Sequence, residues 1–322
     1  MSTDGLWSIG GLAERAGVTV KTVRFYSDRG LLPEAARSGG GHRRYGPDAL
    51  DRLRLIRSLR ALDLPVPEVG RVLGEQDALG DSPGDSLGDA LEGAIAGQLR
   101  EIGSRLTALR WREAALRLVA ECAPAERPGR LRLIGAMTTP PSTAPLARFW
   151  RGWLPARMSA RVVSATVEQA VPPVPEDPTP AQVLAFARLQ AFVSAPCDGS
   201  ARFQPEAHKG GRGYRPELLY DGLAEAYALA AADVREGRAP HGGEALDCFV
   251  AAHAAALGVR DTPGFRRGLG PQLAAEPRLD AYWNLVAELT APPSGRPEPT
   301  PGAADDWLRA ALRKPQLTEG VR

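Results

Sequence analysis

The chain has 322 residues, more than the ~100 to 200 of a usual domain, so we expect two domains and a connector. Apolar residues make up 43% of the sequence and charged residues 24%, and no run approaches the roughly 18 consecutive apolar residues of a membrane span. The N-terminal stretch MSTDGLWSIGG lacks the basic and apolar regions of a secretory signal. These features argue against a membrane protein and predict a soluble, cytoplasmic one.

Charge is distributed unevenly along the chain. Residues 1–74 contain twelve Arg or Lys and eight Asp or Glu, a local net charge of +4. The whole chain carries +2, so the remainder carries about −2. A basic N-terminal segment next to a slightly acidic remainder indicates an anionic partner for that segment.

Two short helices are predicted near the N-terminus. Ser8 can cap a first helix through IGGLAERAGV, which Gly17 ends. Thr19 can cap a second helix that Gly30 ends, with an inward face formed by Val20, Val23 and Tyr26. Two helices of this length joined by Gly-Val predict a helix-turn-helix motif.

A basic hairpin and two more helices follow. The stretch RSGGGHRRYG has three glycines before its basic residues, which predicts a hairpin loop, or wing, that exposes Arg43 and Arg44. Pro47 and Asp48 open a third helix over ALDRLRLIRSLRALDL, and a short fourth helix begins at Pro65.

The second helix is the predicted nucleic-acid contact. Lys21, Arg24 and Phe25 are spaced i, i+3, i+4 and lie opposite the apolar face. Such a face can enter the major groove of DNA, with cations on phosphates or base edges. Any one arginine alone is better explained as a solvated surface charge, but helix, turn, helix and basic wing together favour DNA binding.

A linker is predicted over residues 75–88, which are rich in Gly, Asp and Ser, and a long helix over residues 89–122. An apolar seam with alternating spacings of three and four follows this helix, interrupted by Glu113: Leu99, Ile102, Leu106, Leu109 and Leu116. The pattern predicts a dimerising coiled coil. The alternative is that this face packs against the C-terminal part of the same chain.

Residues 123–322 are predicted to form an all-helical region broken by prolines. Thr179, Pro180 and Gln182 have the pattern of a capping box with proline at the first helical position. The other helices are expected around residues 143–154, 158–171, 218–235, 243–257, 277–289 and 305–314. The fold class is therefore all-α.

Concave ligand sites are mostly apolar and aromatic with a few polar groups. The candidates for such a site are Trp150, Trp153, Tyr227, Phe249, His253, Tyr282 and Trp283. Packing in the core is the alternative explanation for each.

Enzymatic and metal-dependent functions find little support. GDSPG at residues 80–84 matches a nucleophile motif but follows no predicted strand, and HKGGRG at residues 208–213 lacks the spacing of a P-loop. Cys122, Cys197 and Cys248 are scattered, so neither a disulfide framework nor a cysteine metal site is indicated. We expect no enzyme activity, no metal and no cofactor.

Residues 6–74 resemble the winged helix-turn-helix domain of the MerR family of transcription regulators, in WSIGGLAERAGVTVKTVRFYSDRGLLP and GHRRYGPDALDRLRLIRSLRALDLPVPEVGRVL. Phe25 replaces the first of two tyrosines that usually follow the arginine of the recognition helix. The wing has His42-Arg43-Arg44-Tyr45 for the usual Tyr-Arg-x-Tyr, and Gly11 replaces a common glutamate. The DNA-binding set predicted from motif and resemblance is Thr19, Lys21, Arg24, Phe25, Tyr26, His42, Arg43, Arg44 and Tyr45.

The resemblance implies a homodimer held by an antiparallel pair of the long helices. Such proteins bind promoter DNA and distort it when a ligand binds, so that RNA polymerase can use the promoter. Residues 223–312 also faintly resemble the antibiotic-binding domain of TipA-type regulators, in EPRLDAYWNLVAEL and DDWLRAALRK. Together these imply a regulator that senses a small organic molecule. The alternative is a ligand-independent regulator whose C-terminal region binds a protein partner.

Overall fold

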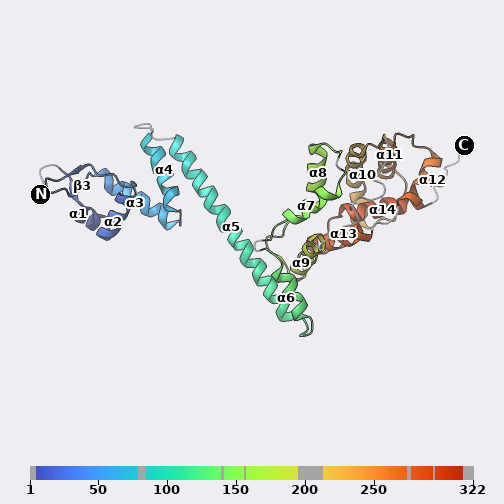
Figure 1. Ribbon diagram of the computed structural model, residues 1–322, viewed down its shortest axis with the longest axis horizontal. Helices are drawn as coiled ribbons and strands as arrows, with labels where there is room; N and C mark the ends of the chain where they lie inside the picture. The colour runs from blue at the N-terminus through green and yellow to red at the C-terminus, as the bar shows by residue number, and fades with distance from the viewer. Residues whose placement is uncertain are drawn as a thin grey trace. The chain divides into compact units, whose positions relative to one another are not determined.

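The computed structural model describes residues 5–78, 85–138, 141–155, 157–194, 213–273, 277–292 and 294–314. The chain divides into two compact units, Met1–Arg105 and Leu106–Arg322, and is coloured along its length in Figure 1. The regular secondary structure of the described residues is helical apart from one small sheet, so the predicted all-α class with an N-terminal winged helix-turn-helix is confirmed. No described helix is long and apolar enough to cross a membrane.

The first unit contains a three-stranded antiparallel sheet and short helices. Its elements are β1 (Trp7–Ser8), α1 (Ile9–Ala16), α2 (Val20–Asp28), β2 (Ala36–Arg37), β3 (Arg43–Tyr45), α3 (Asp48–Ala61), α4 (Val66–Ala78) and the start of α5 (Asp85–Glu121). Strand order is β1-β3-β2, with Trp7 opposite Tyr45 and Ala36 opposite Arg44. The hairpin of β2 and β3 is the predicted wing. Strand β1, two residues long, was not predicted.

Helix caps set the turn between α1 and α2. The Ser8 hydroxyl accepts a hydrogen bond from the Gly11 N–H at 3.1 Å, and Gly17 ends α1 in the left-handed region at φ 63°. The Thr19 hydroxyl accepts from the Thr22 N–H at 3.1 Å and begins α2. Both predicted N-caps and the predicted end of α1 at Gly17 are confirmed, and these local interactions shape the turn.

Apolar residues from α1, α2, α3 and the sheet form one core, which includes Leu12, Val23, Leu53 and Tyr45. Two arginines of α3 support it with hydrogen bonds to backbone carbonyls. Arg57 Nη1 donates to the Ala16 carbonyl at 2.6 Å and Arg52 Nε donates to the Leu31 carbonyl at 2.7 Å. These bonds hold α3 to the ends of α1 and α2, and therefore fix the orientation of the helix-turn-helix.

Helices extend into the stretch predicted as a linker. Helix α4 continues to Ala78 and α5 begins at Asp85, four residues before the predicted start. Asp and Ser are favourable at a helix N-terminus as well as in linkers, so composition alone did not separate the two. The motif at residues 80–84 lies outside the described residues.

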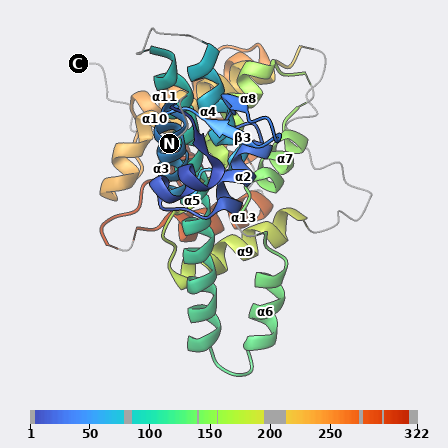
Figure 2. The same ribbon diagram turned by 90° about the vertical axis from the view of Figure 1, so that its left-hand side faces the viewer.

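The second unit contains the remainder of α5 and nine further described helices. These are α6 (Arg127–Gly135), α7 (Ala144–Trp153), α8 (Ala160–Ala170), α9 (Pro180–Ser194), α10 (Pro216–Glu236), α11 (Glu244–Leu257), α12 (Pro263–Gln272), α13 (Pro277–Thr290) and α14 (Pro301–Arg313). Helices α10 and α11 lie side by side, as Figure 2 shows. Helices α6 and α12 were not predicted.

The predicted capping box is present at the start of α9. The Thr179 hydroxyl accepts from the Gln182 N–H at 3.2 Å, and the Thr179 N–H donates to the Gln182 side-chain oxygen at 2.9 Å. The amide nitrogen of buried Gln182 also donates to the carbonyls of Leu289 and Ala291. One side chain thus caps α9 and joins it to the end of α13.

Helices α10 and α11 approach closely at Gly222. A Cβ atom at this position would lie 2.5 Å from the Cβ of Ala252, closer than packed atoms can be. Glycine here and alanine opposite permit the short distance between the two helix backbones.

Candidate nucleic-acid interface

The exposed face of α2 carries the three predicted contact residues. Lys21, Arg24 and Phe25 are all exposed, whereas Val23 and Tyr26 are buried against α1 and the rest of the core. Lys21 and Arg24 make no ion pair within the part of the chain that the structure describes. Two positive charges are therefore available to an anionic partner on one side of a short helix.

Two residues of α2 differ from the prediction. Val20, predicted to face the core, is 41% exposed because it occupies the first turn of α2, beyond the edge of the core. Tyr26, included in the predicted DNA-binding set, is buried, and its ring packs α2 against the core. Thr19 is exposed, and its hydroxyl is used in capping α2.

Phe25 and Arg29 form a pair that the predicted set did not include. The Arg29 guanidinium carbon lies 4.3 Å from the centroid of the Phe25 ring, within the range of a cation–π interaction. The two residues are spaced i, i+4, which was the available signal in the sequence. The pair adds a third positive charge at the end of α2.

The wing is a tight hairpin closed by glycine. Gly41 has φ 77°, its N–H donates to the Ser38 carbonyl, and the Ser38 hydroxyl accepts from the His42 N–H. His42 is exposed and Arg44 half-buried, and Arg44 makes no ion pair with any described residue. Tyr45 is fully buried in the core of the first unit. The structure therefore revises the prediction for Tyr45, because its ring anchors β3 instead of facing outward.

Arg43 is bound within the domain. Its Nη1 lies 2.5 Å from a carboxylate oxygen of Asp28, and its Nε lies 3.3 Å from Glu34. The hydrogen bond to Asp28 raises the pKa of the Arg43 guanidinium. The predicted partner of Arg43 was the DNA backbone. Its pairing with Asp28 and Glu34 was not predicted, because residues this far apart in sequence give no local signal.

Helix α5 has two different faces. The seam residues Leu99, Ile102, Leu106, Leu109 and Leu116 are between 41% and 67% exposed. On another face of its C-terminal half, Trp111, Ala114 and Leu118 are buried in the core of the second unit. The face with Trp111, Ala114 and Leu118 therefore packs within the chain, whereas the predicted dimerisation seam is exposed.

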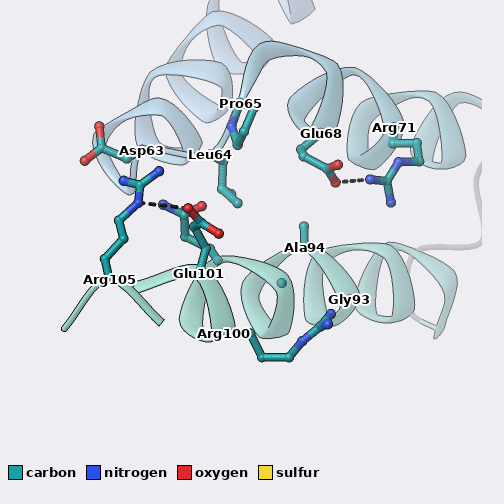
Figure 3. Close-up of a pocket in the computed structure, with 12 residues that line it drawn as sticks. Asp63, Leu64, Pro65, Glu68, Arg71, Gly93, Ala94, Arg100, Glu101 and Arg105 are labelled. Carbon is teal, nitrogen blue, oxygen red and sulfur yellow. Dashed lines mark hydrogen bonds and ion pairs between the residues drawn. The ribbon is translucent and has the colours of Figure 1, made fainter. Parts of the chain in front are cut away.

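A cavity of about 950 Å³ lies between the start of α4 and the N-terminal half of α5. Small residues of α5, Gly93 and Ala94, line it opposite Leu64 and Pro65, as Figure 3 shows. Charged residues surround it, with Arg71 paired to Glu68 and Arg105 Nε 2.8 Å from Glu101. Both signs of charge are present, so the cavity has no clear preference for one ligand charge.

The predicted ligand residues occupy two separate places. Trp150, Trp153, Tyr282 and Trp283 pack together around Phe149, with ring centroids 5.3 Å apart for Trp150 and Tyr282. The other three lie elsewhere, among α10, α11 and α14: Tyr227, Phe249 and His253. Since most of these rings are buried, core packing explains them better than one shared pocket.

Tyr227 and His253 lie near a partly buried ion pair. The Tyr227 hydroxyl donates to Asp305 at 3.0 Å, and Asp305 pairs with Arg309 at 2.6 Å. Burial, followed by the nearby Arg309 charge, lowers the pKa of His253 to about 4. His253 is therefore neutral near pH 7.

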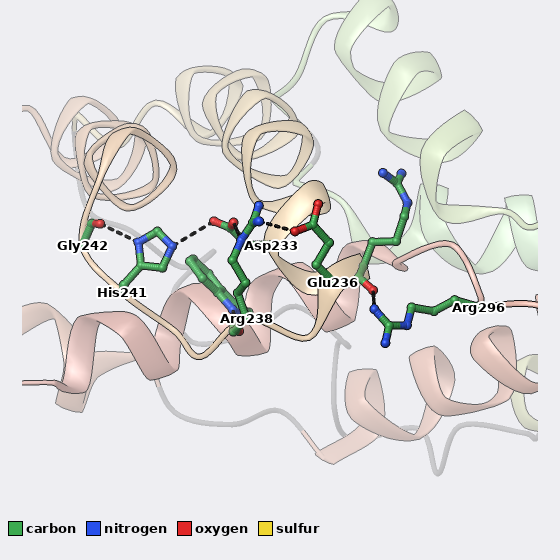
Figure 4. A network of polar contacts seen from close by, with 8 residues as sticks. Asp233, Glu236, Arg238, His241, Gly242 and Arg296 are labelled. Carbon is green, nitrogen blue, oxygen red and sulfur yellow. Dashed lines mark hydrogen bonds and ion pairs between the residues drawn. The ribbon is translucent and has the colours of Figure 1, made fainter.

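A smaller cavity, of about 200 Å³, lies near the end of α10. His241 lies 2.7 Å from the Gly242 carbonyl and 3.1 Å from Asp233, and Figure 4 shows this network together with Arg238. The cavity is below the ~300 Å³ usual for ligand pockets, and its lining includes no predicted ligand residue.

The described residues contain no group of three His, Cys, Asp or Glu side chains placed to hold a metal ion. Cys122 and Cys248 are free thiols, and Cys197 lies outside the described residues, as does HKGGRG apart from Gly213.

An exposed basic helix of a helix-turn-helix beside a basic wing defines a winged-helix nucleic-acid-binding domain. Residues 7–76 match the family described as MerR HTH family regulatory protein. The N-terminal region is thus a MerR-family helix-turn-helix domain.

Relatives with known names match in the same region. The transcriptional activator TipA of Streptomyces coelicolor is 46% identical over 72 residues, which cover 22% of this chain and 28% of TipA. The nodulation protein NolA of Bradyrhizobium sp. (strain NC92) is 40% identical over 75 residues, 23% of this chain and 32% of NolA. The mercuric resistance operon regulatory protein of Bacillus cereus is 38% identical over 69 residues, 21% of this chain and 52% of that protein.

The chain thus covers about a third of TipA and NolA and about half of the mercuric resistance regulator. These alignments lie in the N-terminal region, so the resemblance of residues 223–312 to a TipA-type domain stays a prediction. The names of TipA and of the mercuric resistance protein are regulatory and favour a regulator over an enzyme.

Proposed function

We propose that this chain is a transcription regulator that binds promoter DNA as a homodimer through its N-terminal domain. The observation that carries the proposal is the exposed face of α2, where Lys21, Arg24 and Phe25 lie together and neither cation is neutralised within the described chain. Arg44 on the wing adds a further charge. Phosphate contacts by such cations supply affinity, and residues of the helix that reach base edges supply specificity.

The exposed seam of α5 supports the homodimer. An apolar stripe of this length is unfavourable in water and is typical of a helix that pairs with another. Charge favours an antiparallel pair. With Leu99 and Leu106 at position a of the heptad, parallel helices would place Arg105 against Arg110, Arg112 against Arg117, and Glu113 against its own copy. An antiparallel pair places position a opposite position d, so Glu113 does not face its own copy.

In this proposal the two recognition helices bind two half-sites of one promoter, in the cytoplasm. The dimer bends or untwists the DNA between the half-sites, at a cost of several kcal/mol that contacts on both sides offset. The altered promoter geometry would then control its use by RNA polymerase. This step rests on the family resemblance.

The proposed signal is a small organic molecule bound by the second unit. The aromatic cluster around Trp150 and Tyr282 is the main support, since such clusters line many concave sites. The burial of these rings supports the second candidate instead, in which regulation is ligand-independent and the C-terminal unit binds a protein partner.

Selection of bound duplexes from a random DNA library, followed by footprinting, tests the proposal. We expect one enriched sequence with two inverted half-sites, protected by a species that sediments as a dimer. Failure to enrich any sequence would contradict the DNA-binding function. A thermal-shift screen then separates the two candidates, because a ligand at 100 times its Kd stabilises by ~2.7 kcal/mol.

A further inference from the structure

A chain of ion pairs connects the end of the recognition helix with the wing. Asp28, the last residue of α2, contacts Arg43 at 2.5 Å, and Arg43 contacts Glu34 at 3.3 Å. Glu34 in turn contacts Arg37 of β2 at 2.7 Å. One arginine thus links three segments: the helix terminus, the loop after it, and the first residue of β3.

The alternation of side chains along β3 explains why Arg43 lies against the domain. Successive side chains of a strand point to opposite faces, so Arg43 shares a face with Tyr45, which is buried in the core. Arg44 lies on the other face. The side chain of Arg43 is only 30% exposed, whereas Asp28 is 51% exposed at the rim of the domain.

Arg43 differs from the other cations of the interface because nearby carboxylates neutralise its charge. The two carboxylates in contact with Arg43 outweigh its single positive charge, and with Arg37 included the cluster of four is neutral. A neutral cluster contributes little attraction for phosphate. Lys21, Arg24 and Arg44, by contrast, have no such partner among the described residues.

We propose that Arg43 is a positioning residue, which with Asp28 and Glu34 fixes the wing relative to α2 so that Arg44 and the recognition helix contact DNA together. The inference rests on the proposed DNA-binding function. Holding the wing in its bound position before binding removes an ordering cost at the moment of association. The role predicts that an acidic residue promotes DNA binding.

Whether Asp28→Asn weakens or strengthens DNA binding therefore tests the proposal. Loss of an acidic residue near DNA ordinarily strengthens binding, because it removes repulsion from phosphate. If Asp28 holds the wing through Arg43, its loss weakens binding instead. Glu14→Gln is the matched control, since Glu14 is exposed in the same domain and its carboxylate makes no ion pair with a described residue.

The experiment measures the Kd of the full chain for a duplex selected by the wild type, by fluorescence anisotropy over a range of salt concentrations. We expect Asp28→Asn and Arg43→Ala each to raise Kd by about two- to fivefold, the effect of an exposed ion pair. The double variant should bind no more weakly than the weaker single variant, because both changes break one network. Glu14→Gln should bind as tightly as the wild type or more tightly.

The salt dependence distinguishes positioning from phosphate contact. A lost phosphate contact makes the negative slope of log K against log salt less steep by about 0.9, as expected for Arg44→Ala. Arg43→Ala should keep the wild-type slope. A slope less steep by about 0.9 for Arg43→Ala, or tighter binding by Asp28→Asn, would overturn the inference while leaving DNA binding intact. A wild type that binds no duplex would instead contradict the proposed function.

Discussion

The guanidinium of Arg29 lies over the ring of Phe25, 4.3 Å from its centroid, on the exposed face of the recognition helix. A cation held over a ring is oriented as well as attracted, at about 0.5–1 kcal/mol for an exposed pair. Phe25 thus orients a positive charge at the end of α2 without needing a hydroxyl. The ring is 41% exposed, so it can itself contact DNA.

Phe25→Tyr should tighten DNA binding. A tyrosine keeps the ring under Arg29 and adds a hydroxyl that can donate to a phosphate, a hydrogen bond of about 1 kcal/mol or fivefold in Kd. Anisotropy titration with the selected duplex measures the change. An unchanged Kd would show that the ring acts through packing and Arg29 alone.

If the proposed homodimer forms through the seam of α5, Leu106→Lys should yield monomers. Leu106 lies in the middle of the exposed seam, so in a pair of α5 helices a charge there would be buried without a partner. Sedimentation velocity reports the change in mass. Leu218→Lys on α10, an exposed leucine outside the seam, is the control and should leave the dimer intact. A dimer that persists in Leu106→Lys would place the interface elsewhere.

Gly222→Ala should destabilise the second unit by about 1–3 kcal/mol, because the added methyl group collides with Ala252 across the α10–α11 contact. Five of the six tryptophans lie in this unit, so urea unfolding followed by tryptophan fluorescence reports mainly on it. Gly268→Ala in α12 meets no neighbouring atom within 4 Å and should stabilise slightly. Equal effects of the two changes would refute the close-packing explanation.

Stability of the second unit should fall as pH is lowered from about 6.5 towards 4. His253 has a pKa of about 4 when folded and near 6.5 when unfolded, so in this range protons bind preferentially to the unfolded chain. The loss is at most about 3 kcal/mol. Burial also raises the pKa of Asp305 in the folded state, and this shift increases stability as pH falls. A variant that removes only the contribution of His253 is therefore needed.

His253→Gln provides that comparison, because it removes the titrating imidazole and leaves Asp305 in place. Urea unfolding at pH 7 and pH 5 should show a larger loss of stability for the wild type than for His253→Gln. Identical losses in the two proteins would mean that His253 titrates normally in the folded state.

Short-range features were predictable from sequence and long-range ones were not. The caps at Ser8 and Thr19 and the capping box at Thr179 depend on residues within three positions, and all were predicted. The exposed Lys21, Arg24 and Phe25 followed from helical periodicity. The pairing of Arg43 with Asp28 spans 15 residues and depends on how the hairpin folds back, which no local pattern encodes.

The second unit illustrates the same limit. Aromatic residues such as Trp150 and Tyr282 are typical of both ligand pockets and cores. Only their burial in the structure favours the core. Helix α12 was missed because its sequence, PGFRRGLGPQ, contains three glycines and a second proline within ten residues. Thr262 caps it nonetheless, and Leu269 packs into the core, so tertiary contacts outweigh the low propensity.

The central claim, that α2 binds DNA through its exposed cations, is tested most directly by the affinity of Arg24→Ala for the selected duplex. Arg24 is exposed and without an ion pair among the described residues, so the variant should stay folded by circular dichroism and dimeric by sedimentation. We predict that specific binding is lost while these properties are kept. Binding of Arg24→Ala with wild-type affinity and specificity would contradict the account.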